Sequence, residues 1–143
     1  MNNLRSILYI SSAVHPPSYE QMRHLLHKAR ERNAINDITG ILLLVDSNFM
    51  QYIEGPEQNL NNIYQIIKND TLHKGIIEIF NEPIRSRLCS NWNMAFDSTD
   101  FKGFTDPDQY HSILHPNLIK ADVDSADIYG LLNNFWNSHR SFT

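Results

Sequence analysis

Residues Ile38–Pro56 read ITGILLLVDSNFMQYIEGP and carry the clearest structural pattern in the chain. Ile38–Val45 is a near-continuous apolar run, which is typical of a central strand covered on both faces. Asp46-Ser47-Asn48 supplies turn residues, and Phe49–Glu54 has the composition of a returning strand. Gly55-Pro56 ends this hairpin and starts a helix, because proline is tolerated in a first helical turn. The stretch therefore predicts a β-hairpin followed directly by a helix.

The same two periodicities, two residues for strands and 3.6 for helices, predict elements on both sides of the hairpin. Ser18 and Gln21 have the spacing of a capping box, which marks the start of the first helix. The predicted elements outside the hairpin are a strand over Leu4–Ala13, a helix from Ser18 to about Arg32, a helix carrying Leu60, Ile63, Tyr64 and Ile67, and strands over Gly75–Phe80 and Asn91–Phe96. The order β-α-β-β-α-β-β predicts an α+β, ferredoxin-like sheet with two helices on one face.

The composition changes after about Phe96. A polar, turn-like stretch is followed by two short helical patterns, Pro107–Leu118 and Val123–Trp136, which are too small to form a domain. We therefore expect one domain over residues 1–97 and a C-terminal helical extension over residues 98–143. Because the apolar faces of these helices need cover, they are expected to lie on the open face of the sheet or to make a homo-oligomer contact.

Composition excludes several classes of function. The net charge of −4 and the scattered cations argue against non-specific nucleic-acid binding, and the Arg85-Ser86-Arg87 cluster is typical of a solvated turn. No apolar run approaches the roughly 20 residues of a membrane-spanning helix. The single cysteine, Cys89, excludes an internal disulfide framework, and Met1–Arg5 lacks the pattern of a signal peptide. We expect a cytoplasmic protein without a membrane partner.

Three polar residues fall where a plain core would be apolar. Strand alternation puts Gln51 on one face with Phe49 and Ile53, and burial of a carboxamide without partners costs on the order of 1–3 kcal/mol. Tyr9 carries a hydroxyl into the first strand, and Asn33 sits where the first helix ends. Taken singly, each has an ordinary explanation: a tyrosine reaching solvent, a glutamine on a wet face and an asparagine helix cap. Their combination favours a polar site inside the sheet.

Other reactive residues have weaker patterns. Two histidine pairs have helical spacing, His24 with His27 and His111 with His115. Neither pair has a cysteine or carboxylate arranged as in a zinc site, so no metal is expected. Cys89 has no identifiable base and is interpreted as a small buried or surface thiol rather than a nucleophile, and Glu54 is interpreted as a polar strand end.

Taken together, four motifs in order resemble the BLUF family of flavin photoreceptors. They are Leu8-Tyr9-Ile10-Ser11, then Ala29–Asn33 with Ile38–Leu42, then Phe49–Gly55 as F-x-Q-x-[LI]-E-G, and Trp92-Asn93-Met94 as W-x-M. Each motif alone is weak, but four at the family's separations are specific. The resemblance covers roughly Leu4 to Phe96.

The resemblance implies a flavin bound without a covalent bond, as FAD by the family's habit, with FMN and riboflavin as alternatives. Tyr9 would donate an electron and a proton to the excited flavin, and Gln51 would bridge Tyr9 to the N5/O4 edge of the ring. Asn33 would hold the O4/N3 edge. Ile38 would help to sandwich the ring, and Arg32 would lie at the rim of the site.

The resemblance also implies a signalling route. Trp92 and Met94 would lie on the last strand beside Gln51 and report its hydrogen-bonding state to the surface. Two positions depart from the family pattern: the usual Arg-His pair after the second helix is Leu72-His73, and Cys89 replaces a common aromatic residue. These departures affect surface contacts and the path to the last strand more than flavin binding.

The function that the resemblance implies is a non-enzymatic blue-light receptor that acts on a separate downstream signalling protein. Two alternatives stay open. A small flavin-dependent redox enzyme would use the same pocket with substrate access to the flavin. A cofactor-free, ferredoxin-like interaction module would keep the fold without the pigment.

Overall fold

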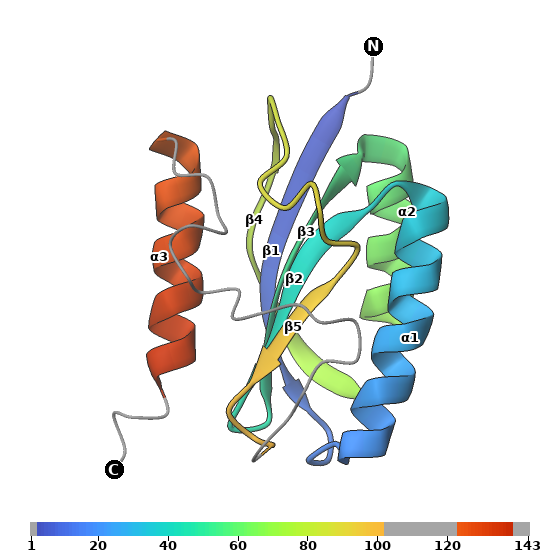
Figure 1. Cartoon of the computed structure of the whole chain (residues 1–143), viewed down its shortest axis with the longest axis vertical. Helices are drawn as coiled ribbons and strands as arrows, with labels where there is room; N and C mark the ends of the chain where they lie inside the picture. Colours follow the sequence, from blue (N-terminus) through green and yellow to red (C-terminus); the bar gives the residue numbers. More distant parts are fainter. Residues whose placement is uncertain (1–2, 102–122, 139–143) are drawn as a thin grey trace.

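Of the described helices, two pack on one face of a mixed sheet and the third lies on the opposite face (Figure 1). This arrangement is seen in a computed structural model that describes residues 3–101 and 123–138. The elements in chain order are β1 Leu4–Ala13, α1 Tyr19–Asn36, β2 Thr39–Val45, β3 Asn48–Pro56, α2 Glu57–Lys68, β4 His73–Pro83, β5 Ala95–Ser98 and α3 Val123–Asn137. The predicted ferredoxin-like order, with α1 and α2 on one face, is confirmed.

The strands lie in the order β4-β1-β3-β2-β5. β1 pairs antiparallel with β3 and β4, β2 pairs antiparallel with β3, and β5 joins parallel to β2. In this register Gln51 of β3 lies opposite Tyr9 of β1 and opposite Leu42 of β2. The middle of the sheet therefore brings Tyr9 and Gln51 together.

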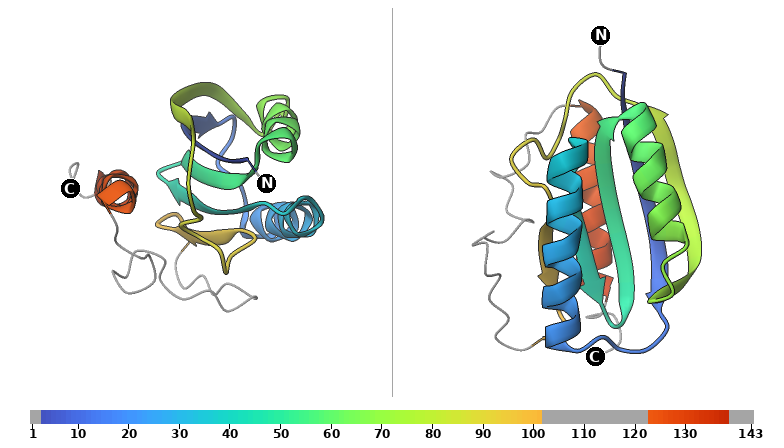
Figure 2. Two further views of the ribbon diagram at one scale, coloured as in Figure 1. Left: turned by 90° about the horizontal axis from the view of Figure 1, so that it is seen from above. Right: turned by 90° about the vertical axis from the view of Figure 1, so that its right-hand side faces the viewer.

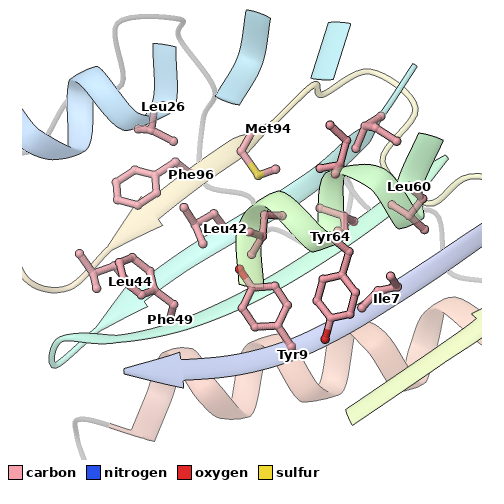
Figure 3. Packing of buried hydrophobic residues seen from close by; sticks show 14 of the residues in the cluster. Ile7, Tyr9, Leu26, Leu42, Leu44, Phe49, Leu60, Tyr64, Met94 and Phe96 are labelled. Carbon is pink, nitrogen blue, oxygen red and sulfur yellow. The ribbon is translucent and has the colours of Figure 1, made fainter. Parts of the chain in front are cut away.

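The sheet has an apolar core on each face, which explains the unbroken apolar run of β2. Viewed from above, α1 and α2 lie on one side of the strands and α3 on the other (Figure 2). On the α1 and α2 side, Ile7, Leu42, Phe49 and Met94 are among the buried residues (Figure 3). On the α3 side, the buried residues include Leu8, Ile41, Leu43, Met50, Tyr52, Ile128 and Leu132. Alternate strand residues serve alternate cores.

α1 is one turn longer than its apolar stripe predicts. It ends at Asn36 rather than near Arg32, because Asp37 adopts a left-handed conformation with φ of 59° and donates its N–H to the carbonyl of Asn33. This is a common way to end a helix. Asn33 therefore lies within the last turn of α1, where its side chain is buried.

β5 is Ala95–Ser98, and the prediction of a strand over Asn91–Phe96 is wrong at its start. The ladder with β2 begins where Ala95 pairs with Ile41. Before that point the chain turns, with Trp92 N–H bonded to the Cys89 carbonyl and the Trp92 carbonyl accepting from Gly40 N–H. Trp92 and Met94 therefore lie in the segment that leads into β5, and the prediction that they lie on the strand is also wrong.

β4 is longer than the predicted Gly75–Phe80 because it follows β1 along most of its length. Among the described strands it pairs only with β1 and forms an edge of the sheet, with register irregularities between Leu8 and Tyr9 and between Ile10 and Ser12. Such irregularities are common at sheet edges.

α3 matches the helix predicted over Val123–Trp136, and its Ile128 and Leu132 are buried against the sheet. It covers the face left open by α1 and α2, as expected. The helix predicted over Pro107–Leu118 lies outside the described residues. Among the residues that are described, no helix is long and apolar enough to span a membrane.

Gly40 permits a close approach of β2 to β3. A Cβ atom there would lie 2.2 Å from the Tyr52 carbonyl oxygen and 3.1 Å from Ile53 Cα. Both atoms are backbone and cannot move aside alone. We expect Gly40→Ala to lower the free energy of unfolding in urea by about 3 kcal/mol, at the upper end for overpacking.

Gly130 of α3 is the matched control, because a Cβ there meets nothing within 4 Å. Gly130→Ala should stabilise the helix by about 0.5–1 kcal/mol. A Gly40→Ala protein as stable as wild type would contradict the role of Gly40.

Candidate functional site

A cavity of about 380 Å³ lies between α1 and α2 over the sheet, within the size range of small-molecule sites. Its apolar lining comes from α1, the sheet and α2, with Leu25, Ala29, Leu42, Phe49 and Ile67. Its polar lining includes Tyr9, Gln51, Arg32 and His73. Figure 3 shows Tyr9, Leu42, Phe49 and Met94 together on this side of the sheet.

Tyr9 and Gln51 form the buried polar pair of the cavity, with 3% and 5% of their surfaces exposed. The Tyr9 hydroxyl donates a hydrogen bond to Gln51 Oε1. Gln51 Nε2 in turn donates to Met94 Sδ over 3.5 Å. Thioether sulfur is a weak acceptor, so the amide nitrogen is only loosely held. The placement of Gln51 on the core face agrees with the strand alternation.

Burial raises the pKa of the Tyr9 phenol well above its ordinary value, and the neighbouring Tyr64 raises it further. The rings of Tyr9 and Tyr64 lie side by side from β1 and α2, with centroids 5.9 Å apart (Figure 3). Arg32 acts in the opposite direction on the pKa of Tyr9 but is outweighed by burial. The phenol therefore keeps its proton while it donates to Gln51.

His73 lies beside Tyr9 at the other wall of the cavity, with ring centroids 6.1 Å apart. Its Nε2 is 2.6 Å from the Ile67 carbonyl oxygen, and its Nδ1 is 2.7 Å from Ser11 Oγ. Because a carbonyl only accepts, Nε2 carries a proton. In the neutral ring Nδ1 then accepts from the Ser11 hydroxyl, so His73 ties the start of β4 to α2 and β1.

Two buried polar atoms near the end of α1 lack a hydrogen-bond partner among the described residues: Asn33 Oδ1 and Arg32 Nε. Arg32 lines the cavity. Asn33 does not, but its Nδ2 donates to the Asn93 carbonyl over 2.7 Å, next to Met94. Buried polar atoms without partners are uncommon, and such atoms beside a cavity are suited to a polar ligand.

Ile38 is fully buried and does not line the cavity; it packs against Gly55, where a Cβ atom would lie 2.6 Å from Ile38 Cδ1. The structure therefore brings Tyr9, Gln51 and Arg32 to the cavity and leaves Ile38 behind its wall. Ile38 belongs to the same buried cluster as Phe49 and Met94, so it supports the residues that line the cavity.

α1 carries a row of basic residues along the cavity. His24, Lys28 and Arg32 follow at intervals of four residues and all line it, so they share one face of the helix. Both His24 and Lys28 are exposed on α1, and neither was predicted as a site residue. Their four-residue spacing from Arg32 is the signal that identifies them. This row suits an anionic group on a ligand.

Met94 and Trp92 lie on opposite sides of the sheet. Met94 lines the cavity and contacts Gln51. Trp92 instead packs against the core on the α3 side of the sheet, so its predicted position beside Gln51 is wrong. The two residues are only two positions apart, and the segment that carries them passes the sheet edge from one core to the other.

Glu54 is not the polar strand end that its place before Gly55 suggests. It is fully buried, and its carboxylate accepts hydrogen bonds from the Thr39 and Tyr52 hydroxyls and from the Leu88 and Cys89 backbone N–H groups. Alternation assigns Glu54 to the face of Met50 and Tyr52. The sequence pattern does not show that residues 88 and 89 cover this face of the sheet.

Arg87 is likewise not part of a solvated turn. Its side chain is 15% exposed and lies 3.0 Å from the Asp37 carboxylate. It also donates to Thr39 Oγ1 over 2.9 Å and to the Asp37 carbonyl over 2.8 Å. Arg87 therefore ties the chain before Cys89 to the loop between α1 and β2.

Cys89 is buried, and burial together with the nearby Glu54 carboxyl raises the pKa of its thiol. It is therefore poorly suited to act as a nucleophile. Within residues 3–101 and 123–138 no group of three or more His, Cys, Asp or Glu side chains could hold a metal ion. His111 and His115 lie outside the described residues.

Folding stability should fall at alkaline pH because burial raises the pKa of Tyr9, Tyr52 and Cys89. The unfolded chain releases these protons near about pH 8.5 for cysteine and about pH 10 for tyrosine, while the folded protein retains them. Folding therefore loses stability as pH rises, by about 1.4 kcal/mol per retained proton per pH unit.

The measurement is the urea midpoint from pH 6 to about pH 11, which should be level at first and fall above about pH 8.5. Tyr52→Phe should reduce the slope above pH 10. A midpoint that is level or rising over the whole range would contradict the prediction.

Comparison with known proteins adds three findings. The family model BLUF, described as sensors of blue-light using FAD, matches residues 4–95. The beta subunit of photoactivated adenylate cyclase from Euglena longa is 35% identical over 95 residues, which are 66% of this chain and 11% of that protein. The blue light- and temperature-regulated antirepressor BluF of Escherichia coli is 34% identical over 76 residues, 53% of this chain and 19% of that protein. The chain thus spans a small part of these relatives.

Solved structures agree in fold. BlrB, described as a BLUF protein in its dark state, has 32% identity and a TM-score of 0.65, covering 68% of this chain and 74% of that one. Klebsiella pneumoniae BlrP1 in its manganese and cyclic diGMP complex at pH 6 has a TM-score of 0.75 and covers 95% of this chain and 33% of that one. At 23% identity, the second likeness shows the fold alone.

Proposed function

Because the chain belongs to the BLUF family of sensors of blue light that use FAD, we propose that it binds the flavin in the α1–α2 cavity and senses light through Tyr9 and Gln51. The observation that carries this proposal is the buried hydrogen-bonded series Tyr9–Gln51–Met94 on the floor of the cavity. It connects a phenol, an amide and a weak acceptor by two successive hydrogen bonds at the lining of the cavity.

The residues present fit a flavin. Its planar ring needs apolar walls, which α1 and α2 supply, and its edge carries both a donor N–H and acceptor oxygen and nitrogen atoms. Arg32 Nε offers a donor at the cavity lining, and Asn33 Oδ1 is a buried acceptor one residue further on that is not part of the lining; neither has a partner among the described residues. Lys28 and Arg32 place two cations at the cavity against the single carboxyl group of Asp70, which favours a phosphorylated flavin, FAD or FMN, over riboflavin.

A bound flavin excited by blue light supplies a strong one-electron oxidant. The raised pKa of Tyr9 keeps its proton in place until an electron has left, and oxidation then makes the phenol strongly acidic. Its proton can leave only along the hydrogen bond to Gln51 Oε1 that the described residues provide. When electron and proton return to Tyr9, no net oxidation remains.

Gln51 is what changes. Its carboxamide both donates and accepts: rotation would exchange the oxygen and the nitrogen that face Tyr9 and Met94, whereas tautomerisation would move a proton from the nitrogen to the oxygen. The bond from Nε2 to Met94 Sδ must break during this change, so Met94 is in a position to influence its rate. After the change, the amide presents a different hydrogen-bonding pattern to the cavity, which would shift the flavin absorption slightly to the red.

The change at Gln51 would pass to the other core through the segment before β5. Met94 meets Gln51 in the cavity, whereas Trp92 packs against the core that holds Ile128 and Leu132 of α3. We propose that residues 1–97 sense light and that residues 98–143 pass the signal to a separate protein in the cytoplasm, as a homo-oligomer. No catalytic step on a substrate is proposed for this chain.

The test is an absorption spectrum of the purified protein before blue light, after it, and through recovery in the dark. A flavin spectrum that moves slightly to the red and returns supports the proposal. Bound flavin that a nicotinamide cofactor reduces stably would instead support the redox enzyme. Colourless protein that cannot be loaded with FAD would support the interaction module.

A further inference from the structure

Glu54 holds the chain that delivers Met94 to the cavity, although it lies on the opposite side of the sheet. Its two carboxylate oxygens bind adjacent backbone amides: Oε1 accepts from Leu88 N–H over 2.7 Å and Oε2 from Cys89 N–H over 2.8 Å. Hydrogen bonds to an ionised acceptor are about twice as strong as neutral ones. The start of the segment is therefore fixed to β3, three residues beyond Gln51.

The remaining lone pairs of the carboxylate are also filled. Tyr52 donates to Oε1 over 2.9 Å and Thr39 to Oε2 over 2.7 Å. Thr39 Oγ1 also receives a bond from Arg87. The carboxylate thus has a full set of donors in a fully buried place, and side chains of β2 and β3 hold its orientation.

The other end of the segment is held at the cavity. The Asn93 carbonyl accepts from Asn33 Nδ2, and the Met94 carbonyl accepts from Arg30 Nε over 2.9 Å. Met94 follows Cys89 by five positions, and the turn at Trp92 is closed by its own bond back to Cys89. A shift at the Glu54 end would therefore be carried to the Met94 side chain.

We propose that Glu54 is a positioning residue for the light reaction: by holding the Leu88 and Cys89 amides, it sets the point from which Met94 contacts the Gln51 amide. The inference rests on the proposed function, since it concerns the same pair of residues. Without this anchor, Met94 would restrain Gln51 less, and the amide would return to its dark arrangement faster.

Glu54→Gln tests the anchor with almost no change in shape. A carboxamide offers one oxygen where the two amides need two, so its own N–H₂ group would face a backbone N–H. Tyr52→Phe is the matched control, because it removes a donor from the same carboxylate but leaves both backbone bonds in place.

Two measurements apply: the dark-recovery rate of the flavin-loaded protein, and amide hydrogen exchange in the flavin-free protein. In Glu54→Gln we expect recovery to be about tenfold faster and the Leu88 and Cys89 amides to exchange at least about tenfold faster. In Tyr52→Phe both rates should stay within about threefold of wild type.

A double mutant separates positioning from general loosening. If Glu54 acts through Met94, Glu54→Gln added to Met94→Ala should accelerate recovery no further than Met94→Ala alone. Effects that multiply, or recovery of Glu54→Gln at the wild-type rate, would overturn the inference and leave the proposed function standing. A wild-type protein without a light-induced shift would overturn both. If Glu54→Gln does not fold, hydrogen exchange of the wild-type protein still tests the inference. Leu88 and Cys89 amides that exchange as fast as unprotected amides would overturn it.

Discussion

Tyr9→Phe should bind flavin and lose the light-induced red shift. Phenylalanine keeps the ring that packs beside Tyr64 but removes the hydroxyl that donates to Gln51 Oε1. The electron donor and the proton donor of the proposed reaction are then both lost. We expect the yield of the red-shifted form to fall by about a hundredfold or more, the scale seen when a positioned proton donor is removed. Flavin fluorescence should rise, because Tyr9 no longer quenches the excited state.

Tyr64→Phe is the control for this result. Tyr64 is also a buried tyrosine, with its ring 5.9 Å from that of Tyr9, but it makes no hydrogen bond to Gln51 within the described part of the chain. It should keep the red shift and the quenched fluorescence. A Tyr9→Phe protein with a wild-type red shift would exclude Tyr9 as the donor. Failure of Tyr9→Phe to bind flavin would assign the residue to binding instead.

The elements of the fold were predictable where the pattern that specifies them is local. β1 was predicted at its observed bounds, and the hairpin strands agree to within two residues at each end. Local signals also place Gln51 on the core face. Local signals do not show which distant residues cover a face of the sheet, and for this reason the interpretation of Glu54 as a polar strand end is wrong. Its partners at Leu88 and Cys89 lie more than thirty residues away in sequence.

The start of β5 was missed for a related reason. Trp92 and Met94 alternate as strand residues do, but the chain there is held by hydrogen bonds from α1 and β2 rather than by a ladder. The alternation is nevertheless meaningful, because it reflects side chains directed to two different cores. Because its side chains pack into both cores, this segment is suited to carry a change from the cavity to α3. The same alternation gives it the sequence pattern of a strand.

Some of the site residues could be predicted from the sequence, and others depend on contacts that only the folded chain makes. Tyr9 and Gln51 are placed together by the β1–β3 register, which a ferredoxin-like order already implies. The basic row on α1 could have been identified from spacing alone, given the position of Arg32. Arg87 could not, because its contacts with Asp37 and Thr39 depend on how the chain after β4 returns across the sheet.

Gln51→Leu should also lose the red shift, but with a different fluorescence. Leucine removes the acceptor for the Tyr9 hydroxyl and the donor to Met94, so no hydrogen bonds remain to rearrange. Tyr9 itself stays in place and can still give an electron to the excited flavin. We therefore expect the red shift to be absent while the fluorescence stays quenched relative to Tyr9→Phe. The two variants together would separate electron donation from hydrogen-bond rearrangement.

The free energy of unfolding of Gln51→Leu must also be measured, because a loss of stability alone could disrupt the site and abolish the red shift. The Tyr9 hydroxyl becomes a buried donor without a partner, which costs about 1–3 kcal/mol in the free energy of unfolding. Asn59→Leu is the control, because it removes a half-buried carboxamide whose Nδ2 donates to the Asn36 carbonyl, away from the cavity lining. It should keep the red shift despite its own loss of stability. A red shift that persists in Gln51→Leu would mean that the light signal does not pass through this amide, and the proposed rearrangement would have to be abandoned.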